Sequence, residues 1–167
     1  MKNNYNIVLI GFMGSGKTTI GNILGKKLNK NFIDTDQLIE KSANTNIAQI
    51  FDKFGEKYFR NLERDLIFSL KNISGSVIST GGGTFCNEQN INILKSIGKI
   101  IYLRTSYKCL ISRFTNEEIL KRPLLSDLKK LNNLLVEREK YYLQADYCIL
   151  TDNKTTQNIS DQIIKLF

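Results

Sequence analysis

The stretch Gly-Phe-Met-Gly-Ser-Gly-Lys-Thr at residues 11–18 constrains the fold of this chain more than any other feature. It matches the pattern G-x-x-x-x-G-K-[ST] of the Walker A loop. An apolar run at residues 7–10 predicts a strand buried on both faces, and a helix is predicted at residues 17–28. A chance glycine-rich turn is the alternative. Because the motif is complete and stands between a strand and a helix, the sequence favours a phosphate-binding loop.

The residues of this loop have separate tasks around a nucleotide. Backbone N–H groups of the glycine-rich turn can surround the phosphates. Lys17 can reach the β- and γ-phosphates as a cation, and the Thr18 hydroxyl can ligate Mg²⁺. The predicted nucleotide-binding residues of the loop are Gly14, Ser15, Gly16, Lys17, Thr18 and Thr19. The motif leaves the reaction open, although the chain lacks the Asn-Lys-x-Asp motif with which GTPases bind guanine.

The remaining sequence alternates predicted strands with helical patterns. Strands are expected at residues 5–10, 32–33, 77–79, 99–103 and 147–150. This order predicts an α/β fold, a three-layer sandwich with a five-stranded parallel sheet and right-handed crossovers, which is the P-loop NTPase fold. The 167 residues suit a single domain, 1–167.

One connection is unusually long. About forty residues separate the second and third predicted strands, and they predict helices at residues 37–41, 47–54 and 57–70. A helical insertion of this size beside a phosphate site predicts a substrate-binding region at about residues 36–71.

Charge and composition narrow the chemistry. The net charge of +8 would attract anions, although the lysines could serve solubility alone. The basic residues form no single block and do not alternate with aromatic residues, so we do not expect nucleic-acid binding. With no histidine, catalysis must use carboxylates, cations and the backbone. Three widely spaced cysteines predict reduced thiols in the cytoplasm, and we expect neither a signal peptide nor membrane association.

Two aspartates, Asp34 and Asp36, directly follow the second predicted strand. Residues two apart in an extended segment project to the same side, and the carboxyl ends of parallel strands open onto the ligand crevice. One carboxylate could hold the water shell of Mg²⁺ while the other takes or orients the proton of an acceptor hydroxyl. Alternatively, Asp36 only caps the next helix.

An arginine interrupts the apolar face of the helix predicted at residues 127–145. One stripe of this helix carries Leu128, Leu131, Leu135 and Tyr142, and the opposite side carries Lys129, Asn133, Glu137 and Lys140. Arg138 falls within the apolar stripe. Because an unpaired buried charge is costly, Arg138 needs an anionic partner, which is either a structural carboxylate or a bound anion.

A second arginine, Arg60, stands at the edge of the apolar face of the helix predicted at residues 57–70, three residues before Glu63. A carboxylate that fixes a guanidinium leaves its remaining donors for a ligand, although a plain surface pair is the alternative. Three consecutive glycines, Gly81, Gly82 and Gly83, follow the third predicted strand. They allow a ligand to approach the backbone closely and supply N–H donors.

The only proline of the chain, Pro123, lies in a polar segment at about residues 115–126 that we expect to be a mobile lid. Proline favours an extended conformation for the preceding residue, Arg122. An arginine on a closing loop can neutralise the transferring phosphoryl group, and closure excludes water. An ordinary solvated loop is the alternative.

Together these motifs resemble those of the shikimate kinases, which have the nucleoside-monophosphate-kinase-like P-loop fold. The resemblance runs in family order over essentially the whole chain. It rests on Gly-Phe-Met-Gly-Ser-Gly-Lys-Thr-Thr at 11–19, Phe-Ile-Asp-Thr-Asp-x-x-Ile-Glu at 32–40, Phe-Arg-x-x-Glu at 59–63, Thr-Gly-Gly-Gly at 80–83, Arg-Pro-Leu-Leu at 122–125, and Arg138 followed by Tyr142 and Ala145.

The resemblance implies a single P-loop kinase domain that converts ATP and shikimate into ADP and shikimate 3-phosphate on the chorismate route to aromatic amino acids. It implies Mg²⁺ as cofactor and a cytoplasmic, monomeric enzyme. The implied catalytic residues are Lys17, Asp36 as the base, and Arg122 of the lid, which would also contact the nucleotide. Thr18 would hold the metal directly and Asp34 would hold it through water. Arg113 would lie near the adenine. The implied shikimate contacts are Asp36, Arg60, Gly81, Gly82, Gly83, Arg138, Phe51 and Phe59, with Pro123 and Leu124 as further apolar walls.

One departure from the family pattern concerns residues 152–156, which lack the proline that the family often has beside the adenine, so the preference for ATP over GTP stays open. Two other functions also stay open. The chain could be another small-metabolite kinase, acting on gluconate or a nucleotide, and a screen of phosphoryl acceptors would identify it. It could also be a non-catalytic ATP-binding module, which would bind ATP without turnover.

Overall fold

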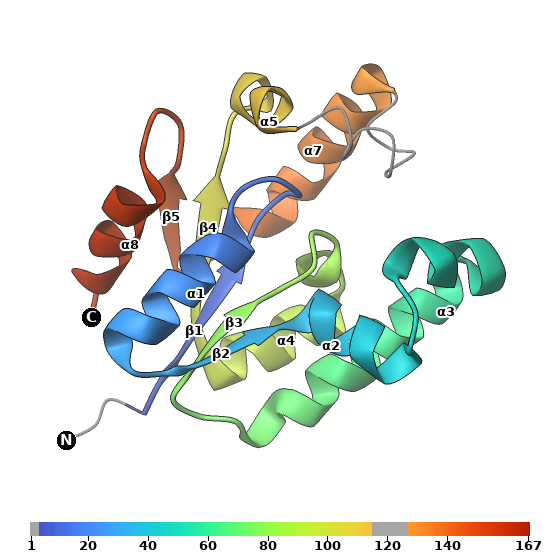
Figure 1. Ribbon diagram of the computed structural model, residues 1–167, viewed down its shortest axis with the longest axis horizontal. Coiled ribbons are helices and arrows are strands. Elements are labelled where there is room, and N and C mark those ends of the chain that lie inside the picture. The colour runs from blue at the N-terminus through green and yellow to red at the C-terminus, as the bar shows by residue number, and fades with distance from the viewer. Residues whose placement is uncertain (1–3, 115–126) are drawn as a thin grey trace.

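Five parallel strands form the sheet of the computed structural model, which describes residues 4–114 and 127–167 (Figure 1). The strands are β1 (Asn6–Ile10), β2 (Asn31–Asp34), β3 (Ser76–Ser79), β4 (Gly98–Arg104) and β5 (Tyr147–Leu150). Their order in the sheet is β2-β3-β1-β4-β5, and every neighbouring pair is parallel. The predicted five-stranded parallel sheet is therefore confirmed, with every strand end within one residue of the predicted one.

The side chains of β1 show why the fold has three layers. Ile7 and Leu9 pack into one hydrophobic cluster, whereas Val8 and Ile10 pack into another on the opposite face. The first cluster includes residues of α1 (Lys17–Leu28) and α8 (Thr156–Ile164), which cover one face of the sheet. The second includes residues of α4 (Glu88–Ile97), α5 (Tyr107–Arg113) and α7 (Leu128–Tyr142) on the other face (Figure 1).

The long connection between β2 and β3 is helical, as predicted. It comprises α2 (Thr35–Ala43), α3 (Ile47–Ser69) and the short 3₁₀ helix η1 (Leu70–Asn72). At Gly55 the backbone of α3 leaves the helical conformation, with φ 79° and ψ 172°, which matches the predicted break between two helices. The insertion has a small core of its own, centred on Ile39, Ile50 and Phe59.

The helix α7 departs from its prediction in two respects. It ends at Tyr142 rather than at residue 145, and its first residue, Leu128, is 50% exposed. The buried stripe is therefore shorter than the predicted one and consists of Leu131, Leu135 and Tyr142. Leu128 stays in solvent because the helix begins there, directly after the N-cap Asp127, whose side chain accepts from the backbone N–H of Lys130.

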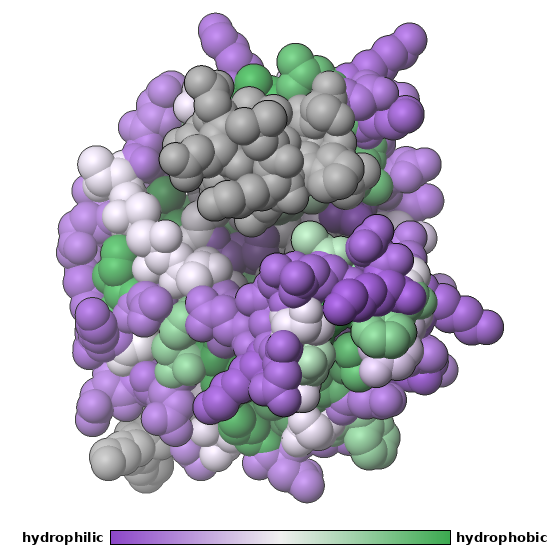
Figure 2. Space-filling model, turned by 45° about the vertical axis from the view of Figure 1, so that its right-hand side comes forward, coloured by the Kyte–Doolittle hydropathy of each residue, from purple (hydrophilic) through white to green (hydrophobic). Residues whose placement is uncertain are grey.

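Figure 2 shows that hydrophilic residues cover most of the face it presents, and that apolar residues occur there in small separate patches. Among the residues that the structure describes, no helix combines the length and the apolar character needed to cross a membrane.

Candidate active site

The phosphate-binding loop lies between β1 and α1, as its sequence predicts. Gly16, at the N-cap of α1, has a left-handed conformation with φ 95°, which explains the need for glycine at that position. The ammonium group of Lys17 donates hydrogen bonds to the carbonyl oxygens of Gly11 and Phe12, both at 2.8 Å. Lys17 is only 8% exposed, so the loop holds its cation inside the cradle.

A cavity of about 760 Å³ opens beside this loop. Its lining includes Gly14, Ser15, Gly16, Lys17, Thr18, Thr19 and Arg113, which are the predicted nucleotide contacts among the described residues. Three further lining residues, Lys154, Thr155 and Thr156, follow β5, in the segment 152–156 that the family resemblance places beside the adenine. Apart from their position after the last strand, nothing in the sequence identified these three residues as part of the cavity wall. We call this space the nucleotide cavity.

Arg113 connects the two sides of the nucleotide cavity. One terminal nitrogen, Nη1, donates to the carbonyl oxygen of Gly14 in the phosphate-binding loop at 3.2 Å. The other, Nη2, donates to the carbonyl oxygen of Thr151 after β5, also at 3.2 Å. Arg113 therefore links the phosphate end of the cavity to the loop where a base would lie.

The two aspartates converge on this site, but not by the predicted geometry. Asp34 ends β2 and is the N-cap of α2, because its Oδ1 accepts from the backbone N–H groups of Asp36 and Gln37 at 3.1 and 3.2 Å. Asp36 already belongs to the helix, so the expectation of two carboxylates on one extended segment is wrong, and the capping residue is Asp34. The other oxygen of Asp34, Oδ2, accepts from the Thr18 hydroxyl at 2.7 Å.

Asp36 lies in a mostly buried position on the wall of the nucleotide cavity. Burial raises the pKa of its carboxyl group to about 6, and the negative charges of Asp34, Glu63 and Glu40 act in the same direction, whereas Lys17 lowers it. Its Oδ1 has no hydrogen-bond partner among the described residues. A buried carboxyl group with an unused acceptor and a pKa near neutrality is suited to taking a proton.

The turn at residues 81–83 brings three predicted site residues together. A Cβ atom on Gly81 would lie 2.5 Å from Oδ1 of Asp36, and one on Gly83 would lie 2.7 Å from Nη1 of Arg60. At Gly82 the nearest atom would be Nη1 of Arg138 at 3.4 Å. The close approach that the glycines permit is therefore made by side chains of the protein itself.

Arg60 is fixed by two carboxylates, of which the sequence indicated one. Its Nη1 donates to Oε2 of buried Glu63 at 3.0 Å, as predicted, and Glu63 also accepts from the Thr84 hydroxyl at 2.7 Å. Its Nε and Nη2 donate to Oε1 of exposed Glu56 at 3.2 and 3.1 Å. These bonds use three of the five guanidinium N–H groups and leave one on each terminal nitrogen, an edge that can bind a carboxylate. The i,i+4 spacing of Glu56 and Arg60 was the signal for the missed partner.

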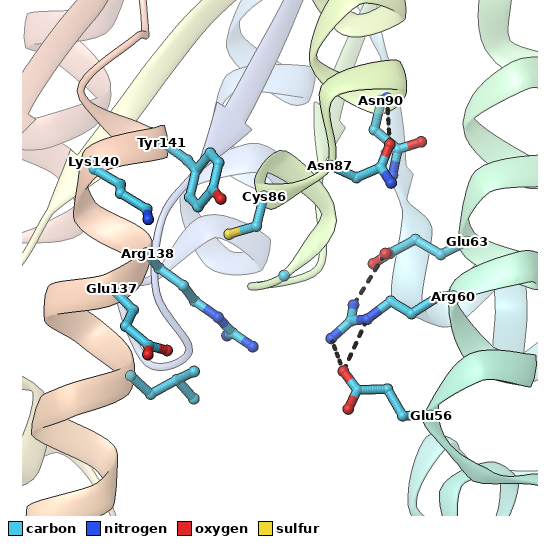
Figure 3. Close-up of a pocket in the computed structure, with 12 residues that line it drawn as sticks. Glu56, Arg60, Glu63, Cys86, Asn87, Asn90, Glu137, Arg138, Lys140 and Tyr141 are labelled. Atoms are coloured by element: carbon cyan, nitrogen blue, oxygen red, sulfur yellow. Dashed lines mark hydrogen bonds and ion pairs between the residues drawn. The ribbon is translucent and has the colours of Figure 1, made fainter.

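A second cavity of about 490 Å³ lies between α3 and α7, and we call it the acceptor cavity. Figure 3 shows Arg60 and Arg138 pointing toward one another across it. Arg138 forms no ion pair with any described residue, and its guanidinium carbon lies 5.7 Å from the centroid of the Phe12 ring. The lining also includes Glu137 and Lys140, which were expected on the opposite side of α7. The residues that sequence reasoning missed here are Glu56, Cys86, Asn87, Asn90, Leu134, Glu137, Lys140 and Tyr141.

Tyr142 ties α7 to the glycine turn. The ring is fully buried and packs against Tyr102, with ring centroids 5.1 Å apart. The hydroxyl donates to the carbonyl oxygen of Gly82. The helix that carries Arg138 is thereby held directly against the turn that contacts Asp36 and Arg60.

Two predicted contacts line neither cavity, and three others fall outside the described residues. Phe59 is buried in the core of the insertion, and Phe51 is 37% exposed with its ring centroid 4.8 Å from that of Phe59. Neither lines the nucleotide cavity or the acceptor cavity. Arg122, like the rest of the lid expected at about residues 115–126, lies outside the described residues, and so do the predicted apolar walls Pro123 and Leu124.

Sequence and structure comparisons agree on one family. A sequence model of the shikimate kinase family matches residues 13–167. A shikimate kinase of a Sulfurihydrogenibium species is 42% identical over 160 residues, which cover 95% of each chain. That of Caldanaerobacter subterraneus subsp. tengcongensis is 41% identical over 97% of this chain and 95% of the other. The shikimate kinase from Acinetobacter baumannii in complex with shikimate superposes with a TM-score of 0.92 at 34% identity, covering 99% of this chain and 93% of that one. This chain therefore belongs to the shikimate kinase family, a family of kinases with the P-loop NTPase-like α/β fold.

Proposed function

We propose that this protein catalyses the transfer of the γ-phosphoryl group of ATP to the 3-hydroxyl of shikimate, giving ADP and shikimate 3-phosphate for aromatic amino acid biosynthesis. The observation that carries the proposal is the pair of facing guanidinium groups, Arg60 and Arg138, in the acceptor cavity. Arg138 also lies 5.7 Å from the ring centroid of Phe12 in the phosphate-binding loop. The two guanidinium groups suit the carboxylate of shikimate. Asp36 lies on the wall of the adjoining nucleotide cavity, where hydroxyl groups of the acceptor would be presented to the nucleotide.

In this proposal each residue has a distinct task. Arg60 and Arg138 bind and orient the carboxylate of shikimate. Asp36 accepts the proton of the 3-hydroxyl of shikimate while the oxygen of that hydroxyl attacks the γ-phosphorus atom of ATP. Lys17 and the backbone N–H groups of the loop stabilise the negative charge on the phosphates during transfer. We also assign Arg122 to the transferring phosphoryl group and Phe51 and Phe59 to the apolar side of shikimate, on the family resemblance alone.

The residues beside the loop fit Mg²⁺. The Thr18 hydroxyl and the Asp34 carboxylate lie 2.7 Å apart, and both are hard oxygen donors. No cluster of three His, Cys, Asp or Glu side chains in the described part of the chain could hold a metal alone, so Mg²⁺ would depend on this pair, water and the phosphates. When bound with the nucleotide, Mg²⁺ would neutralise charge on the β- and γ-phosphates.

We further propose that the protein acts as a cytoplasmic monomer with one P-loop kinase domain over residues 1–167. Its partners would be small molecules, ATP and shikimate, rather than nucleic acid or a membrane. The volume of the acceptor cavity, about 490 Å³, suits a small metabolite and so supports small molecules as the partners.

A coupled assay of ADP release tests the proposal. The protein is mixed with Mg-ATP and either shikimate, quinate, gluconate or AMP, and the variants Asp36→Asn and Arg138→Ala are measured beside the unmodified chain. We expect shikimate-dependent ADP release, a kcat at least about a hundredfold lower for Asp36→Asn, and a raised KM for shikimate in Arg138→Ala. Turnover with a different acceptor would reject the assignment of shikimate. ATP binding without turnover of any acceptor would reject catalysis altogether.

A further inference from the structure

Cys86 places a thiol group inside the acceptor cavity. It ends η2 (Thr84–Cys86), the 3₁₀ helix that follows the glycine turn, and its backbone N–H donates to the carbonyl oxygen of Gly83 at 3.0 Å. Figure 3 shows its side chain between α7, which carries Arg138, and α3, which carries Arg60. The other cysteines of the chain, Cys109 and Cys148, line neither this cavity nor the nucleotide cavity.

The surroundings of Cys86 favour an anionic ligand that also carries N–H groups. Three cations, Arg60, Arg138 and Lys140, line the same cavity together with three carboxylates, those of Glu56, Glu63 and Glu137. Of the charges that act most on the pKa of the thiol, three are these cations and one is Glu63, so the surroundings of the sulfur itself are net positive. Asn90, which is only 1% exposed, lines it as well, and its Oδ1 has no hydrogen-bond partner among the described residues. That oxygen could accept a hydrogen bond from an amide or amino group. The thiol therefore lies where carboxylates and an N–H donor can both be bound.

The electrostatics of the cavity also act on the thiol. Burial raises the pKa of Cys86, and the nearby guanidinium groups of Arg138 and Arg60 oppose that effect, whereas Glu63 adds to it. The group is thus mainly a neutral thiol in the resting protein. The thiolate that attacks a disulfide forms between two cations, which stabilise it and attract an anionic reagent.

We propose that Cys86 is a site of reversible S-thiolation by small disulfides that carry carboxylate and amide groups, and that a group attached there blocks the acceptor. The Cys86 thiolate attacks one sulfur of the disulfide, a new S–S bond forms, and the other half leaves as a thiolate. The disulfide is the only oxidant needed, and a second thiol reverses the step.

The two cavities predict a selective effect on the enzyme. A group bonded to Sγ of Cys86 would fill the space between Arg60 and Arg138 that the proposed acceptor needs. The lining of the nucleotide cavity does not include Cys86. Modification should therefore abolish acceptor binding while nucleotide binding persists. This consequence rests on the proposed function, because it assumes that the acceptor binds between the two arginines.

The test uses a chain whose only thiol is Cys86, made by the substitutions Cys109→Ser and Cys148→Ser, with a thiol-free chain that also carries Cys86→Ser as its control. Each is incubated with glutathione disulfide, which is anionic, or with cystamine, a smaller cationic disulfide. Intact mass spectrometry measures the labelling rate with and without shikimate. Calorimetry measures nucleotide binding, and the ADP-release assay measures activity before and after reduction with dithiothreitol.

We expect one glutathione per chain, attached roughly tenfold faster than the cystamine half despite the larger reagent. Shikimate should slow labelling, Lys140→Gln should reduce the preference for glutathione disulfide, and activity should fall with labelling and return on reduction. An unreactive Cys86, faster reaction with cystamine, labelled protein that keeps its KM for shikimate, or labelled protein that no longer binds nucleotide would each overturn the inference. If the untreated chain does not phosphorylate shikimate, the proposed function fails, while the labelling rates still decide the reactivity and charge preference of Cys86.

Discussion

At residue 81 glycine leaves room for the carboxylate that we propose as the base. The position needs glycine because Asp36 occupies the space that a Cβ atom would take, and the same holds at residue 83 for Arg60. The residue between them is less crowded, with Nη1 of Arg138 at 3.4 Å. The side chains of Asp36, Arg60 and Arg138 can therefore approach the backbone of the glycine turn directly, because no side chain of the turn stands between them.

Substitution of these glycines tests that interpretation. In Gly81→Ala the new methyl group must displace the Asp36 carboxylate, and a shift of about 1 Å at a reacting group costs roughly a hundredfold in kcat. Gly82→Ala is the matched comparison, because ordinary contact distances there predict a much smaller loss. Steady-state kinetics of both variants measure the effect. Equal losses in the two would contradict the steric argument.

Asp36 also predicts the pH dependence of the reaction. Its pKa lies at about 6, above the ordinary 3.8, because burial disfavours the charged form, which is the proposed base. We expect log kcat/KM to fall with unit slope as the pH drops below about 6. Calorimetric titration of acceptor binding over the same range separates this effect from weaker binding. Full activity maintained down to pH 5 would exclude Asp36 as the base.

The same carboxylate should destabilise the fold. Between pH 3.8 and about 6 the folded protein binds more protons at Asp36 than the unfolded chain does, so its stability falls as pH rises through that window and stays lowered at pH 7. The difference corresponds to at most about 3 kcal/mol. Asp36→Asn should therefore raise the free energy of unfolding at pH 7, with a smaller gain at pH 4. Asp34→Ala, which removes the cap of α2, should lower it by about 1 kcal/mol. Urea denaturation at both pH values measures these changes, and a destabilised Asp36→Asn chain would refute the sign.

At the scale of elements, the sequence predicted most of the features that depend on apolar periodicity and on the positions of glycine residues. The strands and the break in α3 follow from apolar runs and from Gly55. The geometry of Asp34 and Asp36 was predicted wrongly because it depends on where β2 ends and α2 begins, and a boundary shift of two residues exchanges strand for helix. Likewise, Glu137 and Lys140 were placed opposite the stripe of α7, although the acceptor cavity reaches around the flank of that helix. A helical pattern gives a face but not the width of the cleft beside it.

The kink in α3 yields a prediction for the whole insertion. Gly55 has a backbone conformation that only glycine adopts readily, and open space surrounds its Cβ position. Gly55→Ala should therefore cost about 1–3 kcal/mol through backbone strain rather than through a clash. Because Glu56 follows directly and holds Arg60, the KM for shikimate should rise while the KM for ATP stays constant. Lys57→Ala, at an exposed helical position, is the control. A change in the KM for ATP alone would contradict the argument.

At the scale of the whole molecule, the hydrophobic residues that the structure describes form two large clusters on the two faces of the sheet and a small third cluster in the insertion. A core built around three fully buried side chains stabilises less than the clusters beside β1 and β4. We expect amide hydrogen exchange to be fastest in α2 and the first part of α3 and slowest in β1. Shikimate should slow exchange in the insertion selectively, and uniform exchange across the described elements would argue against a separately stabilised insertion.

Lys17 has a consequence for the turnover cycle. Its ammonium group donates to the carbonyl oxygens of Gly11 and Phe12, so the side chain ties the start of the phosphate-binding loop to the start of α1. A phosphate oxygen that binds this cation has to compete with those two carbonyl oxygens. The affinity that the cation adds is therefore the difference between two sets of partners, which favours prompt release over tight retention of ADP.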